Sequence, residues 1–91
     1  MSTATGTFEV KNRLGLHARA ATKLVQTAAK FACEVWVSRD DQRANAKSVM
    51  GVLLLCGSKG TLLTIEATGD GAEEAVAAIG SLIDARFGEE E

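Results

Sequence analysis

The spacing of apolar residues switches along this 91-residue chain between the period of a strand and the period of a helix. Residues 7–11, 33–38 and 61–67 alternate apolar and polar side chains, which predicts three strands with one buried face each. Residues 18–31 carry apolar side chains three and four positions apart, and so does the segment that begins at Asp70. This second spacing predicts two amphipathic helices, each with one buried stripe.

Two shorter elements complete the order. Residues 40–42 have the composition of a hairpin turn and lead into a short strand over residues 43–46. Ser48 precedes an apolar run up to Leu54 and is suited to cap a short helix there. Asp70 and Glu73 match a capping box for the last helix, whose apolar stripe runs to Phe87 before Gly88 ends it. The acidic residues 89–91 are expected to fray.

The element order βαββαβα predicts an α+β fold. Strands with one polar face favour an antiparallel sheet that helices cover on one side only, although chain order leaves the strand order open. At 91 residues the chain is expected to form one domain over residues 1–91, with a core at about residues 5–88 and an acidic tail at 89–91.

Composition argues against several classes of protein. A net charge of −2 predicts no nucleic-acid partner. Cys33 and Cys56 are isolated, which predicts no metal site and two reduced, mostly buried thiols. Residues 1–6 lack the features of a signal peptide, and the longest apolar run, residues 52–56, is too short to span a bilayer. We expect a cytoplasmic protein without direct membrane insertion.

The only histidine, His17, lies at the start of the first predicted helix. Residues 10–33 contain five Lys or Arg and no Asp or Glu, whereas the remaining chain holds five basic residues and all twelve acidic ones. Free N–H groups and the positive end of the helix dipole also favour an anion at a helix start. Arg19 is suited to bidentate contact with phosphate, and Gly15 leaves room for a close approach. The pattern predicts a phosphoryl group carried by an imidazole nitrogen.

Two segments resemble the HPr family, the histidine-containing phosphocarriers of the bacterial phosphotransferase system. Residues 15–19, with Ala21 and the stripe at residues 24–25, are similar to the active-site segment of that family. Residues 45–52 are similar to its regulatory-serine motif, and the resemblance covers roughly residues 5–88. It implies an open-faced β-sandwich, with four antiparallel strands and three helices on one face.

The resemblance also implies roles for individual residues. His17 would accept phosphate on Nδ1 from enzyme I and pass it to IIA domains, without a cofactor. Arg19 would stabilise the phosphate, and the backbone amides of Ala18 and Arg19 would be further donors. Ala20 departs from the proline usual in the family, which would reduce preorganisation of the site by roughly 0.4–1 kcal/mol.

Ser48 has both a structural and a regulatory interpretation. The structural one is the helix cap; the regulatory one, implied by the resemblance, is phosphorylation by an HPr kinase/phosphorylase. An exposed apolar patch beside His17, formed by Val49, Met50 and Leu53, would dock enzyme I and IIA partners.

Three functions follow from these residues. The first is a phosphocarrier that is not an enzyme in its own right. The second is a regulatory module, either of the nitrogen type or acting through phosphorylated Ser48 on a transcriptional regulator. The third, a small hydrolase with His17 as general base, lacks a second catalytic group.

Overall fold

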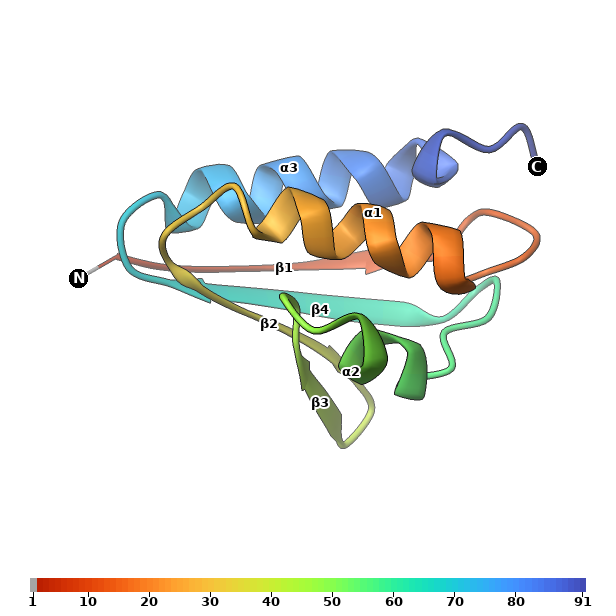
Figure 1. The fold of residues 1–91 in the computed structure, drawn as a ribbon, viewed down its shortest axis with the longest axis horizontal. Coiled ribbons are helices and arrows are strands. Elements are labelled where there is room, and N and C mark those ends of the chain that lie inside the picture. The colour runs from red at the N-terminus through yellow and green to blue at the C-terminus, as the bar shows by residue number, and fades with distance from the viewer. Residues whose placement is uncertain (1) are drawn as a thin grey trace.

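The computed structural model describes residues 2–91 and shows a four-stranded antiparallel sheet with three helices on one face (Figure 1). The predicted fold class and the order βαββαβα are therefore confirmed. The elements are β1 (Thr3–Glu9), α1 (Ala18–Ala28), β2 (Glu34–Arg39), β3 (Gln42–Asn45), α2 (Val49–Leu54), β4 (Leu62–Thr68), α3 (Ala72–Asp84) and a short 3₁₀ turn, η1 (Arg86–Gly88).

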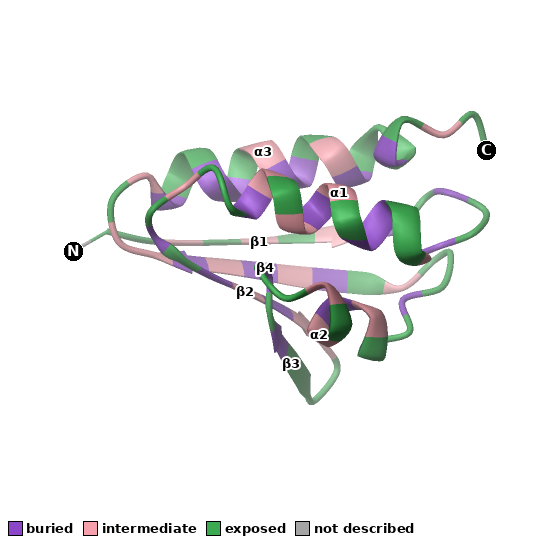
Figure 2. Ribbon diagram, viewed as in Figure 1, coloured by how far each residue is buried: buried purple, intermediate pink, exposed green. Residues whose placement is uncertain are grey.

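The sheet has the strand order β1-β4-β2-β3, which chain order alone did not reveal. β4 lies between β1 and β2 and pairs antiparallel with both, with Phe8 opposite Leu63 and Val37 opposite Ile65. Alternate residues of β2 and β4 point toward the helices and are buried, as the predicted period of two requires (Figure 2). The open face of the sheet carries the intervening residues, which are mostly polar but include Trp36 and Leu62.

The helices cover the sheet in two groups. α1 and α3 run side by side across β1, β4 and β2, while α2 lies beside β3 (Figure 1). The buried stripe of α1 contains three alanines and Leu24, and these small side chains let the helix approach its neighbours closely. This packing brings the N-terminal end of α1 and the C-terminus of the chain to the same end of the molecule (Figure 1).

Both ends of α3 differ from the sequence prediction. The residue that caps its start is Gly71, in a left-handed conformation with φ 82°, and no side chain makes a capping bond there, so the predicted capping box does not form. The helix ends at Asp84, before the predicted end of the stripe. Phe87 instead lies in η1 and is fully buried with φ 54°, because a left-handed turn returns it to the core.

The two cysteines have different environments. Cys33 is buried as predicted, whereas Cys56 is exposed at the end of the turn after α2, so the prediction for Cys56 is wrong. Within residues 2–91, no helix has both the length and the apolar character needed to cross a membrane.

Candidate functional site

His17 caps the start of α1, where the sequence predicted it. Its backbone is extended, with φ −77° and ψ 178°, and its carbonyl accepts the N–H of Ala21 at 2.9 Å. The ring nitrogen Nδ1 accepts the backbone N–H of Arg19 at 3.3 Å. One quarter of the side chain (25%) remains exposed, so a partner molecule has access to the ring.

Gly15 has a different role from the one that the sequence suggested. A Cβ at this position would lie 2.4 Å from the carbonyl oxygen of Gly57, and the backbone has φ +66°. The neighbouring Leu16 N–H donates to the same Gly57 carbonyl at 2.7 Å. Gly15 is therefore required for the loop before α1 to pack against residue 57, rather than for the approach of a partner.

A carboxylate lies on the other side of the His17 ring. Nε2 of His17 forms a hydrogen bond with Oε2 of Glu89, and Asn12 Nδ2 donates to the second oxygen, Oε1, at 3.0 Å. Asn12 is fully buried and also donates to the Gly15 carbonyl at 2.8 Å. The acid-free segment around His17 in the sequence is therefore approached in space by an acid from the C-terminal tail, and the expectation that the whole acidic tail frays is wrong.

The position of Glu89 follows from how the chain leaves α3. Phe87 is anchored in the core, and its carbonyl accepts a hydrogen bond from Lys23 Nζ at 2.6 Å. The Glu89 N–H then donates to the Arg86 carbonyl at 2.9 Å. These contacts hold the turn and direct the Glu89 side chain toward the start of α1.

The environment of Glu89 favours its ionised form. Burial raises the pKa of this carboxyl, but hydrogen bonds from Asn12 and His17, with the charges of His17 and Arg19, lower it by more. The net result is a pKa below the ordinary value. At neutral pH Glu89 is therefore a carboxylate, which is a hydrogen-bond acceptor only.

The lowered pKa predicts a loss of stability in acid. A carboxyl with a lower pKa in the folded protein than in the unfolded chain contributes stability above the unfolded value, and this contribution is lost as the pH falls through the folded value. The difference in unfolding free energy between the wild type and Glu89→Gln should therefore shrink as the pH falls below about 4.5. Urea unfolding of both proteins between pH 7 and pH 3 measures it, and a difference that grows in acid would contradict the assignment.

Arg19 is exposed beside this pair, and its guanidinium makes no ion pair within residues 2–91. It lines a hollow of about 160 Å³ together with Arg13, Leu14 and residues 89–91. Arg13 pairs with Glu91 at 3.6 Å. Arg19 is therefore the basic side chain that remains available to a visiting anion.

Ser48 caps α2 as predicted, because its Oγ accepts the Gly51 N–H at 3.1 Å. Of the three residues predicted to form a docking patch, Met50 is exposed, whereas Val49 and Leu53 are half-buried against the core. The structure adds two large exposed apolar side chains that sequence reasoning missed: Leu54 at the end of α2 and Leu14 in the loop before His17. The apolar stripe of a six-residue helix is too short to reveal which side chains face solvent.

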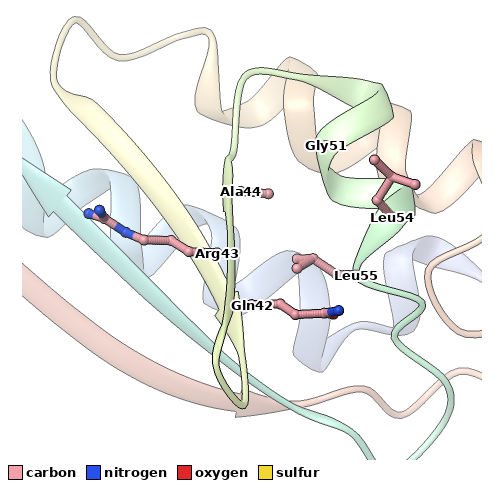
Figure 3. A pocket seen from close by; sticks show the side chains of 6 residues that line it. All are labelled: Gln42, Arg43, Ala44, Gly51, Leu54 and Leu55. Carbon is pink, nitrogen blue, oxygen red and sulfur yellow. The ribbon is translucent and has the colours of Figure 1, made fainter.

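A larger cavity, of about 330 Å³, lies between β3 and α2 (Figure 3). Figure 3 shows that the Arg43 side chain points away from Leu54 and Leu55. The Arg43 guanidinium stacks on the Trp36 ring, 4.2 Å from its centroid. No acidic side chain, histidine or cysteine lines this cavity. Residues 2–91 also contain no group of three or more His, Cys, Asp or Glu that could hold a metal ion.

The arrangement is a partly exposed imidazole that caps a helix beside an arginine without an ion pair in the described residues, at one end of a small open-faced sandwich. A protein that presents one histidine to a partner needs such an arrangement. Residues 4–85 match the family model described as the PTS HPr component phosphorylation site. The chain therefore belongs to the HPr family of phosphocarrier proteins.

Individual relatives agree with this assignment. The chain is 48% identical over 84 residues to the phosphocarrier protein HPr of Neisseria meningitidis serogroup B, covering 92% of this chain and 94% of the relative. It is 44% identical to the phosphocarrier protein NPr of Shewanella violacea, covering 86% of each chain. The crystal structure of HPr from Thermoanaerobacter tengcongensis superposes with a TM-score of 0.93 at 46% identity, covering 97% of this chain and 99% of that one.

Proposed function

We propose that this phosphocarrier holds its phosphoryl group on Nδ1 of His17, receives it from phosphorylated enzyme I and delivers it to IIA proteins. The observation that carries the proposal is the pair of contacts on the ring: a carboxylate on Nε2 and a single backbone N–H on Nδ1. Nδ1 is thus the nitrogen with a lone pair, and it lies at the helix start, where the dipole favours an anion.

Three groups would hold the transferred phosphoryl. The Arg19 N–H, which donates to Nδ1 in the free protein, would be released to a phosphoryl oxygen once Nδ1 forms its bond to phosphorus. The Ala18 N–H lies in the same first turn of α1, and the Arg19 guanidinium would neutralise further charge. Positioning and neutralisation of charge are what phosphoryl transfer chiefly requires.

The test is incubation of the purified protein with enzyme I and labelled phosphoenolpyruvate. The expected product is one acid-labile, base-stable phosphate per chain, located on His17 by mass measurement under conditions that preserve phosphoramidates. A wild-type protein that takes no label under these conditions would contradict the proposal.

Docking of enzyme I and IIA partners is proposed to use the exposed apolar side chains near the site. Met50→Glu should weaken binding of phosphorylated enzyme I at least about tenfold, because a buried apolar anchor contributes about 2 kcal/mol or more to an interface. Leu62→Glu is the matched control, since Leu62 is 61% exposed and alternates along β4 with the inward, buried Leu63. Equal binding of phosphorylated enzyme I by the wild type and Met50→Glu would show that this surface does not dock enzyme I.

Regulation through Ser48 is part of the proposal. A phosphate on this exposed cap would strengthen the start of α2 and place about two negative charges beside Met50. A transcriptional regulator or an HPr kinase/phosphorylase would be the further partners in the cytoplasm.

A nitrogen-type role is the second candidate function, favoured by the NPr relatives. If the phosphorylated protein transferred its phosphate to a sugar IIA protein but not to a nitrogen-type IIA protein, the nitrogen-type role would be excluded.

A further inference from the structure

We propose that Glu89 is a positioning residue that fixes the tautomer of His17, keeping the ring proton on Nε2 and the lone pair on Nδ1. The inference rests on the proposed function, since it concerns how the same imidazole is prepared for reaction. Glu89 lies 72 positions from His17 in the sequence, so nothing in the local motif indicates it.

The tautomer follows from the two partners of the ring. The Glu89 carboxylate accepts hydrogen bonds and donates none, so a neutral ring must place its proton on Nε2. On the other side the Arg19 N–H donates to Nδ1, and this bond requires a lone pair on Nδ1. Two independent groups, one from the C-terminal tail and one from the first turn of α1, therefore stabilise the same tautomer.

The same contact stabilises the charge that appears during transfer. The Nδ1 lone pair forms the bond to phosphorus while the bond between phosphorus and the donor nitrogen breaks, and its electron pair leaves with the donor. The proton stays on Nε2, so the ring gains a positive charge as the phosphoryl group arrives. The Glu89 carboxylate lies against that N–H and offsets the charge, as a carboxylate does beside an imidazole in other catalytic pairs.

Asn12 makes the amide variant of Glu89 a sharp probe. In Glu89→Gln the carbonyl oxygen should remain opposite the Asn12 Nδ2 donor, because the buried Asn12 is held by the Gly15 carbonyl. The new NH₂ group then faces His17 Nε2 and donates to it, which favours the tautomer with its proton on Nδ1. In that tautomer Nδ1 carries the proton, so it has no lone pair for phosphorus and can no longer accept the Arg19 N–H.

The ring nitrogens report the tautomer directly in the unphosphorylated protein. We expect ¹⁵N shifts of His17, recorded at increasing pH until they no longer change, to show a pyrrole-type Nε2 and a pyridine-type Nδ1 in the wild type. Glu89→Gln should shift the ring toward a pyridine-type Nε2, and Glu89→Ala, which keeps the Arg19 N–H on Nδ1, should retain part of the wild-type preference. Glu74→Gln, which removes the same charge at an exposed side chain in the first turn of α3, away from the hollow that Arg19 and Glu89 line, should match the wild type.

The rate of phosphorylation should follow the same order. In single-turnover reactions with phosphorylated enzyme I, we expect Glu89→Gln to be about 10- to 100-fold slower than wild type, less than the ~10⁴-fold loss for a fully buried carboxylate–imidazole pair. Glu89→Ala should be intermediate and Glu74→Gln unchanged. The proposal would be overturned if Glu89→Gln kept the wild-type shifts. It would also be overturned if Glu89→Gln were phosphorylated faster than the wild type, since that would show that the tail blocks the site. A wild-type protein that shows the expected shifts but accepts no phosphate would instead contradict the proposed function.

Discussion

Replacing His17 by asparagine is expected to abolish labelling by phosphoenolpyruvate and enzyme I. His17 is the only histidine of the chain, so no second imidazole can take the phosphoryl group. Asparagine is among the preferred residues at a helix cap, so the variant keeps a side chain that can accept an amide N–H of the first turn of α1. The loss of label would then report the loss of the nucleophile and not the loss of the helix.

Ser48→Ala provides the comparison for this experiment. It removes the only capping side chain of α2 and should cost about 1 kcal/mol of stability, yet it leaves the imidazole and its partners in place. We expect this variant to take full label on His17. Label that persists in His17→Asn would show that another residue accepts the phosphate.

Replacing Phe87 by alanine is expected to destabilise the folded protein by about 3–5 kcal/mol, the usual cost of truncating a fully buried aromatic side chain. Domains of this kind have total stabilities of about 5–15 kcal/mol, so the variant should unfold at a much lower urea concentration. Urea unfolding followed by circular dichroism measures the change.

Phe87→Leu is the matched control, because it separates packing from backbone strain. Alanine and leucine bear the same penalty at φ 54°, so the difference between the two variants reports the buried side chain alone. We expect Phe87→Leu to retain clearly more stability than Phe87→Ala. Equal midpoints for the two variants would show that the ring contributes nothing beyond the turn.

Phe87→Ala should also affect the site. The turn that Phe87 anchors directs Glu89 toward His17, so the ¹⁵N shifts of the ring should move toward a mixture of tautomers even where the variant remains folded. Wild-type shifts in folded Phe87→Ala would show that the tail finds the ring without this anchor.

Periodicity predicted β2, β4 and the start of α1 closely because burial of one face is a local property of the sequence. The prediction was poorer for β1, which covers Thr3–Glu9 instead of residues 7–11, and for the end of α1, which lies at Ala28 instead of residue 31. β2 and β4 begin one residue after the predicted starts, and α1 begins at the predicted Ala18. The end of the chain was harder to predict. Phe87 continues the helical stripe in sequence, but it reaches the core through a left-handed turn, and nothing in its spacing distinguishes the two routes.

The sequence by itself determined the class of fold, the place of His17 at a helix start, the basic segment around it and the cap at Ser48. Each of these depends on neighbours within one or two helical turns. Only the tertiary structure decided the strand order, the role of Gly15 against Gly57 and the carboxylate on Nε2. The reason is physical: Glu89 meets His17 because the core holds Phe87 and the turn after α3 points the tail toward α1, and such a meeting depends on packing across the whole domain.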